Sequence, residues 1–132
     1  MWFEAETDGV LVRAQPQFLD RESNPEQGRF VWAYTIEVDN RSDRTIQLVA
    51  RTWNITDDSG LTQTVRGEGV VGETPVLAPG QRFRYISRCP LREPAGVMVG
   101  SYQMRDCTSG ERFDIAVPAF PLDSPYIVRK AN

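Results

Sequence analysis

The sequence predicts an all-β protein, a two-sheet antiparallel β-sandwich of about seven strands, like those of fibronectin type III or immunoglobulin domains. Three observations predict it. Apolar and polar residues alternate with a period of two in several short segments. Turn residues separate these segments about every eight to twelve positions. Nine prolines and ten glycines also punctuate the 132 residues, and no segment shows helical periodicity.

The first two expected strands are a weaker one at residues 9–14 and the clearest one in the chain at residues 30–39. The loop between them, residues 20–28, is the longest and carries an Asn-Pro pair and four charged side chains. Large side chains share one face of the clearest strand, which is typical of a half-buried strand: Trp32, Tyr34, Ile36 and Val38.

A hairpin is expected next, after a polar turn at residues 40–43. Residues 45–56 return to β-branched and aromatic side chains, and residues 61–66 form the returning strand. The connection at residues 57–60 reads DDSG. Asp and Gly accept the special backbone angles of a tight turn, so this connection closes the hairpin.

The third pair of elements is a turn at residues 77–80 (LAPG) and the strand that it starts at residues 81–88. Proline sets the first backbone angle of such a turn, and glycine tolerates a positive φ. The side chains of the strand separate into two faces. Phe83 and Tyr85 form an apolar face, and the cationic face carries three arginines: Arg82, Arg84 and Arg88.

The last strands are expected at residues 97–106 and 113–117, joined by a polar hairpin. Gly100, in the first of them, predicts that a neighbouring side chain approaches the backbone closely. The tail after Pro118 contains further prolines. We expect this tail to be extended and only partly packed.

The length suits one domain, residues 1–132, with a core at roughly 9–125 and ends that are partly extended. Cys89 and Cys107 are the only cysteines and have no metal-ligand spacing. The sequence shows no signal peptide and no apolar run of about eighteen residues. We therefore expect a cytoplasmic protein with two reduced thiols, in preference to a secreted domain with a disulfide.

The composition excludes several function classes. The chain has no histidine, which removes Ser-His-Asp and Cys-His triads, histidine-ligated zinc and the usual near-neutral general base. A net charge of -3 argues against a nucleic-acid or membrane-surface binder. We expect no enzyme activity, no metal site and no resident cofactor. A hydrolase that uses two carboxylates as acid and base is the third and least favoured class.

One motif points to phosphate chemistry. Residues 67–72 (GEGVVG) match GxGxxG, with Gly67, Gly69 and Gly72 as its glycines. In a dinucleotide fold such glycines precede a helix whose N-terminus receives the pyrophosphate. Prolines follow within a few residues here and prevent that helix. We favour an irregular crossover whose glycines permit close packing, and a nest of backbone N–H groups that holds an anion is the alternative.

Arg82 and Arg84 are the candidate anion contacts, because planar guanidinium groups bind phosphate or carboxylate through paired hydrogen bonds. Other arginines join this face if their strands are neighbours: Arg41, Arg44, Arg51, Arg66 and Arg88. The preferred interpretation is a solvated face whose charges discourage edge-to-edge aggregation, because the whole chain is acidic.

The complete set of motifs resembles the ApaG domain family over nearly the whole chain, roughly residues 9–125. The matching runs are FVWAYTI at 30–36, QLVARTWNITD at 47–57, GEGVVG at 67–72, LAPG at 77–80, YIS at 85–87, GSYQM at 100–104 and FDIAVPAF at 113–120. Each run alone is short, and the combined set in this order is specific.

This resemblance implies a fibronectin type III-like sandwich in a stand-alone bacterial protein that is associated with cobalt resistance and magnesium efflux. It implies that Gly67, Gly69 and Gly72 belong to a pyrophosphate-binding motif, and it supplies no catalytic residue. Related domains in eukaryotic proteins imply a protein-interaction role.

We therefore expect first a non-enzymatic binding module whose partner is another protein, with a homodimer through an uncovered edge strand as one form. Binding of pyrophosphate or a nucleotide at residues 67–72 is the alternative.

Overall fold

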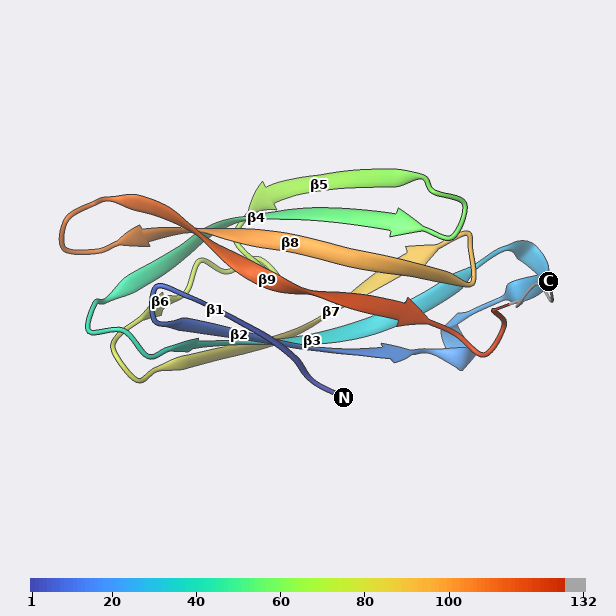
Figure 1. The fold of residues 1–132 in the computed structure, drawn as a ribbon, viewed down its shortest axis with the longest axis horizontal. Coiled ribbons are helices and arrows are strands. Elements are labelled where there is room, and N and C mark those ends of the chain that lie inside the picture. The colour runs from blue at the N-terminus through green and yellow to red at the C-terminus, as the bar shows by residue number, and fades with distance from the viewer. Residues whose placement is uncertain (128–132) are drawn as a thin grey trace.

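The computed structural model describes residues 1–127, whose strands form two antiparallel sheets packed face to face (Figure 1). The first sheet has the order β1 (Phe3–Thr7), β2 (Val10–Phe18), β3 (Phe30–Asn40) and β7 (Arg82–Leu91). The second has the order β5 (Thr62–Glu68), β4 (Ile46–Asp57), β8 (Ala95–Asp106) and β9 (Arg112–Asp123), with β6 (Val76–Leu77) also paired to β4. The predicted all-β sandwich is confirmed.

The alternation predicted for β3 is confirmed in the core. Trp32, Tyr34, Ile36 and Val38 are buried. The residues that alternate with them lie on the outer face and are partly exposed: Ala33, Thr35 and Glu37. Aromatic side chains of the second sheet pack against these residues. The ring centroids of Tyr34 and Trp53 are 5.5 Å apart. Burial of apolar area between the sheets is the main favourable term in the stability of such a fold.

Two strands among residues 1–127 have no counterpart in the sequence prediction, β1 and β6. Phe3 is the only large apolar residue of β1 (FEAET), so the alternation in this strand gives a weak apolar signal. β6 has only two residues, Val76 and Leu77, which pair with the start of β4. The loop at residues 20–28 folds into two single turns of 3-10 helix, Asp20–Glu22 and Pro25–Gln27.

A β-bulge at Val49 changes which face of β4 points into the core. The register of β4 against β8 shifts between Leu48 and Ala50, so one extra residue is inserted there. Before it Ile46 and Leu48 are buried, and after it the parity changes and Trp53 is buried. Bulges of this kind re-aim side chains and are common beside functional sites.

The strand after Phe113 is longer and better packed than the sequence indicates. β9 continues to Asp123, and Phe120 and Leu122 are buried, so the expectation that the tail packs only in part is wrong up to this point. Phe120 and Leu122 are buried because β9 also contains a bulge, which changes the parity of the strand. Four residues of β9, 117–120, lie opposite three residues of β8, 98–100. Pro118 lies within this bulge. Proline has no N–H to donate to a neighbouring strand, so a bulge is one of the few places in a sheet that tolerates it.

The two long sides of the sandwich differ. On one side β9 packs against β1 and β2, and the Ala116 N–H donates to the Thr7 hydroxyl at 3.1 Å, which closes the gap between the sheets. On the other side β5 and β7 end their sheets, and no further strand of residues 1–127 pairs with them. Among the described residues, no helix has the length and apolar character needed to cross a membrane.

Gly100 confirms the close approach predicted from the sequence. A Cβ placed there would lie 2.6 Å from Cε3 of Trp53 and 2.7 Å from the main-chain oxygen of Thr52. Such a methyl group has no space, because both neighbours are fixed in the core.

Gly100→Ala is expected to destabilise the protein by about 1–3 kcal/mol, since the added carbon overpacks the core at Trp53. Urea unfolding measures the change. The control is Val97→Ala on the same strand, where the side chain is 43% exposed and the effect should stay within about 0.5 kcal/mol. Equal effects of the two substitutions would contradict the steric argument.

Candidate functional site

The open side of the sandwich, between β5 and β7, carries three hollows in a row. The outermost and the middle hollow share Gln63 and Pro90 as lining residues. The middle and the innermost hollow share Tyr34, Arg51 and Ser87. The three hollows therefore adjoin one another along the only long side that β9 and β1 do not cover among residues 1–127.

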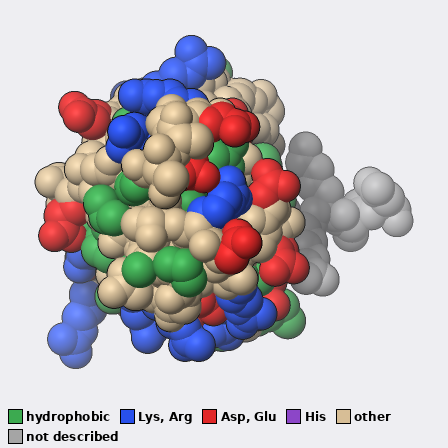
Figure 2. Space-filling view, turned by 90° about the vertical axis from the view of Figure 1, so that its left-hand side faces the viewer, with side chains coloured by type: hydrophobic (Ala, Val, Ile, Leu, Met, Phe, Trp, Pro, Cys, Tyr) green, Lys and Arg blue, Asp and Glu red, His purple; other side chains and the backbone are tan. Residues whose placement is uncertain are grey.

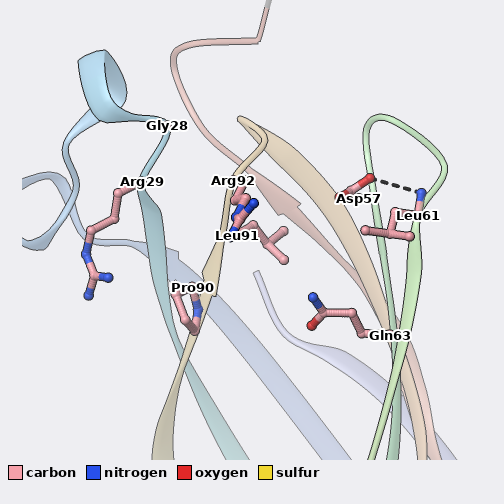
Figure 3. Close-up of a pocket in the computed structure, with 8 residues that line it drawn as sticks. All are labelled: Gly28, Arg29, Asp57, Leu61, Gln63, Pro90, Leu91 and Arg92. Carbon is pink, nitrogen blue, oxygen red and sulfur yellow. Dashed lines mark hydrogen bonds between the residues drawn. The ribbon is translucent and has the colours of Figure 1, made fainter.

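The outermost hollow has a volume of about 390 Å³ and lies at the end of the sheets (Figure 3). Its one carboxylate, Asp57, accepts hydrogen bonds from the hydroxyl and N–H of Ser59 and from the N–H of Leu61. The hydrogen bond from the Ser59 hydroxyl lowers the pKa of Asp57. This carboxylate therefore shapes the predicted β4–β5 turn, and the exposed residues around it form a shallow site.

The innermost hollow, here called the Arg51 cavity, has a volume of about 250 Å³ and centres on a half-buried guanidinium group. Nη1 of Arg51 donates to the main-chain oxygens of Glu68 at 3.1 Å and Gly69 at 2.7 Å. None of the ion pairs within residues 1–127 includes Arg51. Peptide dipoles hold the group in place. Glu68 also lines this cavity, but no carboxylate of residues 1–127 lies within ion-pair distance of Arg51.

Two glycines of the motif at residues 67–72 make room for this arrangement. A Cβ on Gly67 would lie 2.9 Å from Cζ of Arg51, so only glycine lets the guanidinium lie across the strand. Gly69 has a φ of 63°, and a Cβ there would collide with the main-chain oxygen of Glu73. Both positions therefore serve the close packing that the sequence analysis favoured.

The third glycine belongs to a two-residue turn. Val70 and Glu73 exchange N–H···O bonds of 2.8 and 2.9 Å, and the residues between them, Val71 and Gly72, have φ values of 45° and 79°. Two positive φ values in a two-residue loop define a type I′ hairpin turn. The N–H groups of Gly69 and Val70 are bonded within the chain and are not available to an anion. The carbonyl oxygens of Glu68 and Gly69 point to Arg51.

Hydroxyl groups surround the guanidinium. Tyr34, Tyr85 and Ser87 line the Arg51 cavity, and the hydroxyls of Tyr85 and Tyr102 are hydrogen-bonded to each other. Burial raises the pKa of all three tyrosines. They are therefore protonated at neutral pH and offer neutral O–H groups beside a cation.

The middle hollow, here called the Trp53 cavity, has a volume of about 270 Å³ and mixed walls, in which apolar side chains such as Ile55 and Met98 lie beside polar ones such as Gln63. Trp53 is only 3% exposed, and its indole Nε1 is the one buried side-chain N or O atom within residues 1–127 that has no hydrogen-bond partner. Cys89 also lines this cavity; it is buried and free, and burial raises its pKa to about 11. The thiol is therefore protonated at neutral pH, which favours the interpretation of a small buried thiol over a reactive one.

Arg82 and Arg84 do not join the glycine motif. They lie on the face of β7 opposite Tyr85, which lines the Arg51 cavity, because side chains alternate along a strand. Nε of Arg82 lies 3.6 Å from Oδ2 of Asp39, and Nη1 of Arg82 lies 3.9 Å from Oε1 of Glu37. Cζ of Arg84 lies over the ring of Trp2, 5.6 Å from its centroid. The structure supports the predicted solvated face.

Charges of both signs are mixed over other surfaces too. Arg88 pairs with Glu22 at 2.8 Å, and Arg44 lies 3.9 Å from Asp106. Figure 2, which views the end of the sandwich that bears the β8–β9 turn, shows acidic and basic side chains interspersed. Within residues 1–127, no three Cys, Asp or Glu side chains gather where they could hold a metal ion.

These features define a class of protein, a β-sandwich domain with a cationic cavity on the open side between its two sheets. Comparison with known proteins then identifies the family. The ApaG domain model matches residues 20–106, so the chain belongs to the ApaG domain family, as the sequence resemblance implied.

Individual relatives match nearly the full chain. The chain is 52% identical to Protein ApaG of Maricaulis maris over 123 residues, covering 93% of this chain and 94% of that protein. It is 53% identical to Protein ApaG of Bradyrhizobium sp. strain ORS 278 over 130 residues, covering 98% and 99%. The crystal structure described as an ApaA protein from Bordetella pertussis matches with a TM-score of 0.84 and 38% identity, covering 89% of this chain and 95% of that one.

The buried tyrosines predict a loss of stability at alkaline pH. Their folded pKa lies above the ordinary value of 10.0, so the unfolded chain releases these protons first and stability falls as the pH rises beyond 10.0. Urea midpoints at about pH 8, 10 and 11 measure the fall. In the double variant Tyr85→Phe/Tyr102→Phe the urea midpoint should fall less steeply with pH. An unchanged slope would contradict the attribution of this loss of stability to the two tyrosines.

Proposed function

We propose that this protein is a non-catalytic binding domain for a phosphate-bearing anion, which it holds in the Arg51 cavity. One observation carries the proposal: the half-buried Arg51 guanidinium is fixed by two main-chain oxygens and has no acidic partner within residues 1–127. A partly buried charge without a counter-charge is costly, and a bound anion removes that cost. Guanidinium groups bind phosphate through two parallel hydrogen bonds.

The remaining donors of the cavity suit this ligand. Arg51 uses Nη1 for the chain itself, and its Nε and Nη2 groups donate no hydrogen bond to residues 1–127. The hydroxyls of Tyr34 and Ser87 line the same space. Glu68 lines the same cavity and accepts a hydrogen bond from Arg51 through its main-chain oxygen, and its carboxylate makes no ion pair with Arg51.

This proposal changes the residues assigned to the pyrophosphate or nucleotide alternative. Arg51 replaces Arg82 and Arg84 as the anion contact, and Gly67, Gly69 and Gly72 act by seating Arg51. Phosphate oxygens are common ligands of Mg²⁺. A phosphate-binding domain therefore offers an indirect route to the association with cobalt and magnesium that the family implies.

Titration with inorganic pyrophosphate, followed by ¹H–¹⁵N spectra, tests the site. The Arg51 Nε–H signal and the amide of Gly72 should move, and Arg51→Met should weaken binding roughly tenfold or more because it removes charged hydrogen bonds. Arg66→Met is the control, since Arg66 is exposed on the outer face of β5. Unchanged binding by Arg51→Met, or no shift at either signal, would refute the proposal.

A protein partner is the second candidate, favoured by the open edges of the same side. β5 and β7 end their sheets, so their outer N–H and C=O groups are free to pair with an added strand. Large apolar side chains lie along these edges, with Leu61 60% and Ile86 57% exposed. A second copy of the chain is one such partner and would form a homodimer.

A photo-crosslinking residue at Thr64, on the edge strand β5, should trap a partner in cells. The same residue at Val99 is the control, because β8 lies inside the second sheet and Val99 is 45% exposed. Mass spectrometry identifies the product, which must form again from the two purified proteins. A product of twice the chain mass indicates a homodimer, and equal products from both positions would count against the β5 edge.

A further inference from the structure

The Trp53 cavity contains a donor that the chain itself leaves without a partner. The indole N–H of Trp53 is buried and makes no hydrogen bond to residues 1–127. Buried donors are almost always bonded, and one left alone costs free energy. An acceptor from outside the chain, a water molecule or a ligand atom, can satisfy this N–H.

The indole ring is oriented so that this donor lies on the open side of the sandwich. The Cε3 corner of Trp53 is the part that would meet a Cβ on Gly100, so it faces β8. Nε1 is on the opposite side of the ring and therefore lies toward β5. Gln63 and Val65 of β5 line the Trp53 cavity on that side.

The Trp53 cavity and the Arg51 cavity adjoin each other. They share Tyr34, Arg51 and Ser87 as lining residues, so Arg51 stands at their junction. Their characters differ. One end offers a guanidinium group and hydroxyls, and the other offers one buried N–H among apolar side chains such as Ile55 and Met98.

We propose that the two cavities take the two ends of one ligand, an organic phosphate. Its phosphate or pyrophosphate group binds Arg51, and its apolar portion enters the Trp53 cavity, where a ring nitrogen or an oxygen accepts the indole N–H. This inference rests on the proposed function for its anionic end and adds the class of ligand. Inorganic pyrophosphate fills only the Arg51 end.

Two matched pairs of probes test the inference: inorganic pyrophosphate against adenosine 5′-diphosphate, and inorganic phosphate against 4-nitrophenyl phosphate. Each organic probe should bind roughly tenfold tighter than its inorganic counterpart, because it satisfies the buried donor and covers apolar surface. It should also move the indole ¹H–¹⁵N signal of Trp53, which is assigned by its loss in Trp53→Phe.

Trp53→Phe replaces the indole by a phenyl ring, so it keeps an aromatic side chain and removes the N–H donor. It should reduce the affinity for adenosine 5′-diphosphate to that for pyrophosphate and leave pyrophosphate binding unchanged. Val65→Trp is a second variant that fills the cavity from the exposed edge strand, where Val65 is 40% exposed, and it should have the same effect.

The outcomes separate this inference from the proposal on which it rests. If pyrophosphate binds through Arg51 while the organic probes bind no better and leave the indole signal in place, the inference is overturned and the anion site stands. If no probe moves the Arg51 signal, both are overturned. Tighter binding of the organic probes with no response to Val65→Trp or Trp53→Phe also overturns the inference, because their apolar portion then lies elsewhere.

Discussion

The bulge at Val49 is the constraint on which the candidate site depends. By adding one residue to β4 opposite β8, it reverses the faces of the strand, so that Arg51 and Trp53 point between the sheets. A regular strand would instead continue the parity of Ile46 and Leu48 and would turn both side chains to solvent. The core therefore gains a large aromatic residue together with a cation, and the surrounding structure must accommodate the cation.

That accommodation explains the glycine motif without a dinucleotide fold. The guanidinium of Arg51 lies across Gly67 and binds the carbonyl oxygens of Glu68 and Gly69, and the turn at Gly72 returns the chain beside it. Neutral dipoles and tyrosine hydroxyls stabilise the cation without cancelling its charge. This arrangement supports the proposed binding of an anion, and burial keeps the neighbouring tyrosines protonated at neutral pH.

Much of the fold could be predicted from the sequence, and much less of the site. The alternation in β3, the turn at Asp57 and the close approach at Gly100 are local signals, which the structure confirms. The sequence does not predict the bulges in β4 and β9, because a bulge depends on how a strand pairs with its neighbour and a single sequence does not show that pairing. A signal was nevertheless present: the apolar residues of β4 change parity between Leu48 and Trp53. Charge alone makes Arg82 and Arg84 candidate anion contacts, and strand parity places them on the face of β7 opposite Tyr85.

The closure of one side by β9 and β1 has a further consequence for how the molecule can be altered. The Ala116–Thr7 contact joins the two outer strands on that side, while the two cavities lie on the other side, beside the edge strands β5 and β7. The same stretch of surface therefore carries both the danger of uncontrolled strand addition and the capacity to recognise a ligand. If the proposed anion enters from this side, acidic residues added along β5 to improve solubility would repel it, and colloidal stability would be gained at the expense of binding.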